Sequence, residues 1–253
     1  WATFMFGTCV AHALIHSASP LERLAGHLLS GAVGYPLLGY EHLRHHRLAG
    51  NTGAAEWPRV TEPAWKFTVR RLRRILGETV GPEGMLWPES RGAPHVRGLR
   101  LALAMFAAVG AGFAFIAGMV GALMWAATVV LVALTNQLVT YIQHWGLGDD
   151  QLPEAREREC AWEDDCRFQA WMTLNLSVHQ AHHHDAGLPY HRLTLHPESP
   201  RLPVGYVLLF VVAMIPPLWR RIMTPALAYW LQHPGDPPSA GHHLTCVVAY
   251  RSV

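Results

Sequence analysis

The longest apolar run of the chain extends from Leu101 to Gln143 and contains no Asp, Glu, Lys, Arg or His. A single helix of that length would measure about 65 Å, roughly twice the ~30 Å thickness of the hydrocarbon core of a bilayer. We therefore expect two crossings, with a turn marked by Gly118 and Gly121. The run would form a helical hairpin whose two ends lie on the same side of a membrane.

Three other apolar segments are shorter or interrupted. Residues 1–15 predict the end of another membrane helix. Residues 24–40 are broken by several glycines and a proline, and this pattern favours a segment that dips into the membrane or lies along its surface. Residues 202–219 end in a pair of prolines followed by two arginines, which favours a shallow segment over a complete span.

Basic residues flank the predicted hairpin on its open side, with Arg97 and Arg100 before it and a cluster of Lys and Arg at residues 66–74 upstream. The positive-inside rule makes that side cytoplasmic. The formal net charge of only +2 and the absence of one continuous basic face argue against nucleic-acid binding. Lys66 is the only lysine beside many arginines, which indicates a bacterial source.

These patterns predict an all-α, polytopic protein of the bacterial inner (cytoplasmic) membrane. Hydrophobic residues make up 51% of the chain and charged residues 15%, as expected for a chain largely buried in lipid. We expect residues 1–233 to form the membrane-embedded core and residues 234–253 to form a C-terminal tail. Because the chain opens at Trp1 directly in apolar sequence, we expect further transmembrane helices upstream.

Histidine is unusually frequent, with 17 residues, and it is clustered. Four groups read H-A-L-I-H, E-H-L-R-H-H, Y-I-Q-H-W-G and N-L-S-V-H-Q-A-H-H-H, and histidines three or four positions apart share one face of a helix. Imidazole binds several transition metals, and nine imidazoles exceed the needs of one ion. The groups therefore predict two metal ions. The candidate ligands are His12, His16, His42, His45, His46, His144, His179, His182 and His183.

Four carboxylates near these groups are candidates for a supporting role, because a carboxylate often accepts the second ring N–H of a histidine ligand. They are Glu41, Glu163, Asp164 and Asp165. For each one, an ordinary solvated loop charge is an equally good interpretation.

The four histidine groups, in this order and spacing, resemble the membrane alkane 1-monooxygenase family, within the membrane fatty acid desaturase/hydroxylase superfamily. The similarity runs from about His12 to Met223 and includes P-R-L-P-V-G-Y and P-P-L-W-R-R-I-M near its end. The resemblance implies a cytoplasm-facing di-iron site in which the nine histidines bind two non-heme Fe ions. It also implies O2-dependent hydroxylation of a terminal, unactivated C–H bond in an alkane-like lipophilic substrate that arrives through membrane lipid.

The family resemblance further implies an external electron donor. The sequence has four Cys but no C-x-x-C pair that could hold an electron-transfer iron. A rubredoxin or a ferredoxin, with its reductase, is the expected partner.

Two departures from the family pattern keep alternatives open. Ala13 stands where the family usually has Glu, and only Leu43 and Arg44 separate His42 from the following pair. One alternative is a desaturase, hydroxylase or ketolase of the same superfamily that acts on fatty acyl chains or carotenoids, and product identity would separate it. The other is a non-catalytic metal-binding subunit of a larger complex, which would retain iron without O2-dependent turnover.

Overall fold

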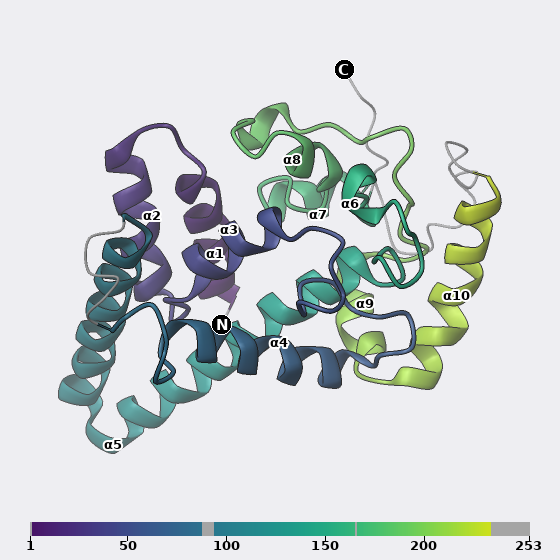
Figure 1. Ribbon diagram of the computed structural model, residues 1–253. Helices are drawn as coiled ribbons and strands as arrows, with labels where there is room; N and C mark the ends of the chain where they lie inside the picture. Colours follow the sequence, from purple (N-terminus) through teal and green to yellow (C-terminus); the bar gives the residue numbers. More distant parts are fainter. Residues whose placement is uncertain (1, 88–93, 165, 234–253) are drawn as a thin grey trace. The chain divides into compact units, whose positions relative to one another are not determined.

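The computed structural model describes residues 2–87, 94–164 and 166–233, and its regular elements are helices (Figure 1). The described residues form no β-strand, and an isolated β-bridge joins Glu163 and Arg201. The all-α fold class is therefore confirmed for this part of the chain, while Asp165 and the predicted tail lie outside it. The elements are α1 (Ala2–Ile15), α2 (Pro20–Ala32), α3 (Leu38–Arg47), α4 (Ala64–Thr79), α5 (Pro94–His144), α6 (Ala155–Arg158), α7 (Arg167–Met172), α8 (Gln180–His184), the 3-10 helix η2 (Tyr190–Arg192), α9 (Tyr206–Ala213) and α10 (Pro216–Gln232).

The described residues divide into two compact units. The first unit comprises residues 2–47 and 71–136, and the second comprises residues 48–70 and 137–233. Each unit has its own core of buried hydrophobic side chains. Two helices, α4 and α5, begin in one unit and end in the other.

The predicted hairpin is present within α5. Helical geometry is interrupted at Ala117 and at Gly118, where φ is +57° and ψ is −138°. Beyond this break the chain reverses, because the Trp125 ring lies 5.3 Å from that of Phe106 and 5.5 Å from that of Phe113. In an uninterrupted helix, Phe106 and Trp125 would be about 28 Å apart. A glycine at this turn is explained by its positive φ, which other residues adopt only with strain.

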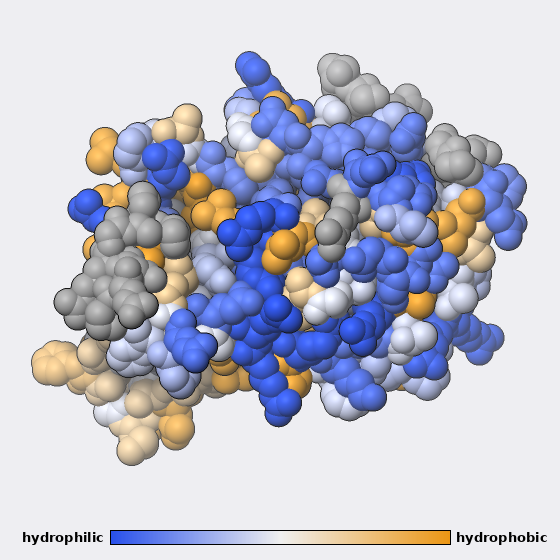
Figure 2. Space-filling model, in the orientation of Figure 1, coloured by the Kyte–Doolittle hydropathy of each residue, from blue (hydrophilic) through white to orange (hydrophobic). Residues whose placement is uncertain are grey.

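The two arms of α5 are each long enough to cross a bilayer. They contain about 23 and 26 residues, or about 35 and 39 Å, against the ~20 residues that a span needs. Among the described residues, Val96–His144 is the one helix that is long and apolar enough to span a membrane by length and composition. Only 17% of its most apolar stretch is buried, and Figure 2 shows an apolar surface where α5 turns.

Residues 24–40 form parts of two short helices joined by a turn, and their predicted place within or along a membrane stays a prediction. Ser19 caps α2 by accepting a hydrogen bond from the backbone N–H of Glu22, and Gly34 turns the chain with φ at +87°. At Gly31, an added Cβ would lie only 2.1 Å from the backbone oxygen of Ala102. The backbones of α2 and the first arm of α5 therefore approach closely because Gly31 has no side chain.

The second unit is built around large aromatic side chains. Trp57, Trp145, Trp162 and Trp219 are each at most 1% exposed and belong to one hydrophobic cluster. The indole N–H of Trp162 donates to the backbone oxygen of Trp145 at 2.8 Å. Helices α9 and α10 contribute side chains to this cluster, and the chain breaks between them just before Pro216. The shallow membrane position predicted for residues 202–219 stays a prediction.

Candidate metal centre

Four predicted ligands gather within the first unit. His12 lies in the last turn of α1, His16 directly follows that helix, and His42 and His46 lie one turn apart on α3. The ring centroid of His42 is 4.1 Å from that of His12, 4.6 Å from that of His16 and 4.5 Å from that of His46. Each of His12, His16 and His42 offers a ring nitrogen, and these three nitrogens lie within 4.8 Å of one another.

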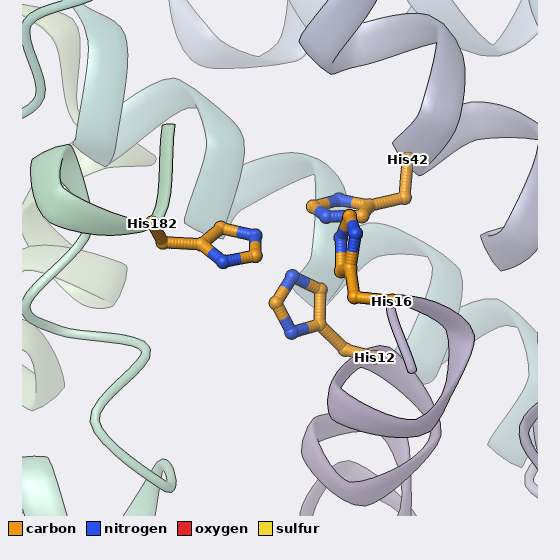
Figure 3. Close-up of side chains that lie close together, drawn as sticks. All are labelled: His12, His16, His42 and His182. Atoms are coloured by element: carbon orange, nitrogen blue, oxygen red, sulfur yellow. The ribbon is translucent and has the colours of Figure 1, made fainter. Parts of the chain in front are cut away.

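Figure 3 shows the rings of His12, His16 and His42 turned toward a common point. His182, also drawn there, belongs to the second unit and is described with it. The remaining ligand candidate of the first unit is His45, whose ring centroid lies 6.0 Å from that of His42. Helical spacing aligns the histidines within each of these groups, and packing of α3 against α1 brings the two groups together.

Two ion pairs, one buried and one half-buried, fix the orientation of α3 about its own axis. Glu41 accepts hydrogen bonds from the Tyr35 hydroxyl and from the Arg71 guanidinium, and Glu41 and Arg71 are both buried. Arg44 forms an ion pair with Glu78 at 2.6 Å. Because a buried charge is costly unless it is paired, these contacts strongly favour one orientation of the helix that carries His42, His45 and His46.

The other four predicted ligands lie in the second unit. His144 ends α5, as predicted, while His179 directly precedes the short helix α8 that contains His182 and His183. The ring centroid of His183 is 5.0 Å from that of His144 and 4.7 Å from that of His179. Ring nitrogens of His144, His179 and His183 lie within 4.8 Å of one another. The ring of His182 lies 5.5 Å from that of His179.

Glu163 joins three separate segments around this second group. Its carboxylate is fully buried and accepts hydrogen bonds from the backbone N–H of Gln180 at 3.1 Å and of His196 at 2.9 Å. It also forms an ion pair with Arg201 at 2.6 Å. Burial raises the pKa of Glu163, and the Arg201 guanidinium and the two N–H groups oppose that shift. Glu163 therefore holds the start of α8, and through it the backbone that carries the histidines.

Asp164 is buried beside Glu163 and performs a similar structural task. It accepts hydrogen bonds from the backbone N–H of Cys166 at 2.8 Å and of Tyr206 at 3.3 Å. Glu41, Glu163 and Asp164 are thus buried and bonded, unlike ordinary solvated loop charges. Their support of metal ligands stays a prediction.

Sequence reasoning missed Trp57. This side chain is fully buried, and its ring stacks on His144 with centroids 4.2 Å apart and an angle of 17° between the planes. It also meets the edge of His183 at 6.0 Å. Trp57 lies in an irregular loop that has no hydrophobic period, so only its place shortly after the second histidine group could have drawn attention to it.

The donor chemistry of both groups fits a transition metal. A metal–nitrogen bond is about 2.1 Å long, so two nitrogens on opposite sides of one ion lie about 4.2 Å apart. Three nitrogens within 4.8 Å in each unit are close to that arrangement. Burial lowers the pKa of His16 to about 4 and, together with the proximity of His16, that of His46 to about 3. These imidazoles are therefore neutral near pH 7, and neutral imidazole is the form that binds metal.

Comparison with known proteins supports the resemblance seen in the sequence. Residues 1–210 match the fatty acid desaturase family. Among curated proteins, the chain is 30% identical to alkane 1-monooxygenase 1 and 29% identical to alkane 1-monooxygenase 2, both of Pseudomonas aeruginosa, in alignments that cover 88% of this chain. It is 27% identical to alkane 1-monooxygenase 2 of Alcanivorax borkumensis over 87% of this chain. The aligned regions are 61%, 62% and 60% of these relatives, so the chain spans about three fifths of their length.

Proposed function

This chain belongs to the fatty acid desaturase family, and from that premise we propose that it hydroxylates an unactivated, terminal C–H bond of an alkane-like lipophilic substrate with O2. The observation that carries the proposal is the close approach of histidine ring nitrogens within each unit. It is combined with the similarity of the chain to curated proteins named alkane 1-monooxygenases. Hydroxylation is favoured over desaturation because the similar proteins carry the name of a monooxygenase.

We propose that the nine histidines bind two non-heme Fe ions. When bound, ferrous iron supplies the reduction of O2 that such a C–H bond requires. The protein contributes neutral imidazoles, which leave the positive charge of the metal uncompensated. Buried carboxylates such as Glu41, Glu163 and Asp164 lie close to the histidines in sequence, and we propose that they support the ligands by accepting ring N–H groups. Asp165 belongs to the same proposal from its place in the sequence.

We propose a multi-pass position in the bacterial inner membrane, with the two arms of α5 crossing the bilayer and the histidines facing the cytoplasm. The length and exposed apolar surface of the arms support the crossing. Basic residues near the open end of the hairpin support the orientation. A cysteine placed at position 119 should then react with a membrane-impermeant reagent in intact cells, whereas one at position 150 should not. The opposite labelling would refute this topology.

The proposed partners follow from the chemistry. An alkane-like substrate dissolves in lipid and can reach a site at the membrane without crossing water. Electrons must come from another protein, because the sequence has no cysteine motif for an electron-transfer iron. A rubredoxin or ferredoxin with its reductase is the donor that we propose.

The test is turnover by the full-length, iron-loaded protein with its redox partners, labelled O2 and a panel of alkanes, fatty acids and carotenoids. Labelled primary alcohol from an alkane is the expected product. A double bond or a ring ketone as the sole product would instead assign the chain to the desaturases or ketolases of the superfamily. Absence of any product, with iron retained, would assign it to a non-catalytic subunit.

Metal analysis tests the ligands separately from turnover. His45→Ala and His182→Ala should each lower the iron content together with the activity. His191→Ala is the matched control, because His191 is exposed and lies outside the four groups. Full iron content in both ligand variants would refute the assignment.

A further inference from the structure

Helix α4 exposes a stripe of apolar side chains. Trp65, Val69, Leu76 and Val80 are 53%, 44%, 43% and 41% exposed, although each is large and hydrophobic. Their spacing of four, seven and four residues places them on one side of a helix, with Val80 continuing the stripe just beyond the last turn. The stripe is about 24 Å long, because α4 contains 16 residues.

The opposite side of α4 is already occupied by the protein core. Ala64, Phe67 and Ile75 are fully buried in hydrophobic clusters, and Arg71 is buried in its pair with Glu41. The apolar stripe therefore lies on the side of α4 that the described residues leave exposed. Contiguous exposed apolar surface of this kind is typical of a site that contacts a partner or a membrane.

Cations border the stripe. Lys66 and Arg73 are exposed and lie next to it around the helix, and the Lys66 ammonium is 5.4 Å from the centre of the Trp65 ring. The one acidic residue of α4, Glu78, is engaged by Arg44 and Arg74. The exposed surface of the helix therefore combines apolar side chains with positive charge, and the surface over α4 in Figure 2 is largely of the polar colour beside apolar patches.

We propose that α4 lies flat in the interface of a bilayer that contains anionic lipid. The apolar stripe enters the boundary between headgroups and acyl chains, while Lys66 and Arg73 contact headgroup phosphates. An apolar stripe flanked by Lys and Arg, with Trp among its members, is the pattern of interfacial helices. An acidic protein would match the cations but would leave the straight line of apolar residues unexplained. This proposal does not depend on the reaction that the protein catalyses.

The test measures the depth of single positions in the full chain, reconstituted in vesicles of phosphatidylcholine with phosphatidylglycerol. Cysteines introduced by Val69→Cys and Leu76→Cys are labelled with an environment-sensitive fluorophore, and the unsubstituted protein gives the background from its own cysteines. We expect blue-shifted emission and quenching by lipids that carry a nitroxide near the headgroup. Arg74→Cys is the matched control, because residue 74 lies away from the stripe and its side chain is 48% exposed.

Water accessibility gives the magnitude. Transfer of one apolar side chain of this size from water to lipid changes the ratio of its buried to its water-exposed population by about tenfold or more. Positions 69 and 76 should therefore react with a water-soluble maleimide about tenfold more slowly than position 74. Lys66→Gln with Arg73→Gln should reduce the dependence on phosphatidylglycerol, whereas Lys66→Arg should retain it.

Two results would overturn the proposal. One is equal labelling at positions 69, 74 and 76 in vesicles, which would show a helix surrounded by water. The other is protection of positions 69 and 76 only after an electron-donor protein is added, which would assign the stripe to a protein partner. Both results are independent of turnover and of iron content.

Discussion

Replacement of Glu163 by alanine should open the segment that carries the last histidine group. The substitution removes the three hydrogen-bond contacts of one buried carboxylate at once, two of them to the backbone N–H groups of Gln180 and His196. It also leaves Arg201, whose side chain is only 9% exposed, without its ionic partner. The segment from α8 to Arg201 should therefore lose its common anchor.

The expected cost follows from these contacts. Removal of one partner from a buried ion pair costs about 3–5 kcal/mol, and each buried N–H left without an acceptor costs about 1–3 kcal/mol. Relaxation of the loop will recover part of that sum, so we expect Glu163→Ala to lower the free energy of local opening by about 3 kcal/mol. Since 1.4 kcal/mol corresponds to a factor of ten, the opening equilibrium should increase by roughly 100-fold.

Hydrogen exchange followed by mass spectrometry measures this directly. Peptides that contain the amides of Gln180 and His196 should lose about two orders of magnitude of protection in Glu163→Ala. Glu163→Gln should give a smaller loss of about tenfold, because the amide oxygen still accepts one hydrogen bond while the charge is lost. If this group binds metal as proposed, iron content should fall in the same order.

The matched control is Glu154→Gln. Glu154 is 46% exposed and pairs with Arg158 at 3.6 Å, so its loss should cost less than about 1 kcal/mol. Unchanged protection of Gln180 and His196 in Glu163→Ala would refute the role assigned to Glu163. A uniform loss of protection across the whole second unit would also contradict it, because the contacts are local.

Substitutions at three further positions, two of them with control variants, test the packing. Trp57→Ala should destabilise the second unit by about 3–5 kcal/mol in thermal unfolding and should lower its metal content. Trp57→Phe should retain most of the stability and of the metal content, because a ring still stacks on His144. Gly31→Ala should lower the unfolding temperature through a cost of about 1–3 kcal/mol, because its Cβ would meet a backbone oxygen at 2.1 Å. Gly118→Ala should lower the stability of the fold by about 1–2 kcal/mol, because alanine adopts a positive φ only with strain. Gly112→Ala is the control and should be neutral or stabilising, because residue 112 faces open space on the same helix. Equal effects of the two substitutions on thermal unfolding would contradict the turn geometry.

Local patterns predicted the helical hairpin of α5 and the close approach of histidines within a group, but they did not predict helices α4, α6 and α7. The uncharged run of α5 and Gly118 at its turn were sufficient to place the hairpin, because length and backbone freedom are properties of neighbouring residues. Spacings of three and four positions likewise placed His42 and His46 on one face of α3. The helix of the last group is shorter than the spacing implied, since His179 precedes α8. Iron binding and membrane crossing stay predictions.

Contacts between distant residues could not be obtained from such patterns. Arg71 meets Glu41 across 30 positions, and Glu163 meets Arg201 across 38, although each of these residues alone resembles an ordinary surface charge in the sequence. Trp57 stacks on His144 from a loop without any hydrophobic period. The sequence by itself therefore determined the helical hairpin of α5 and the shared face of His42 and His46 on α3, since these depend on neighbours along the chain. Tertiary structure decided which buried charges and rings support those histidines, because burial and pairing depend on residues that only folding brings together.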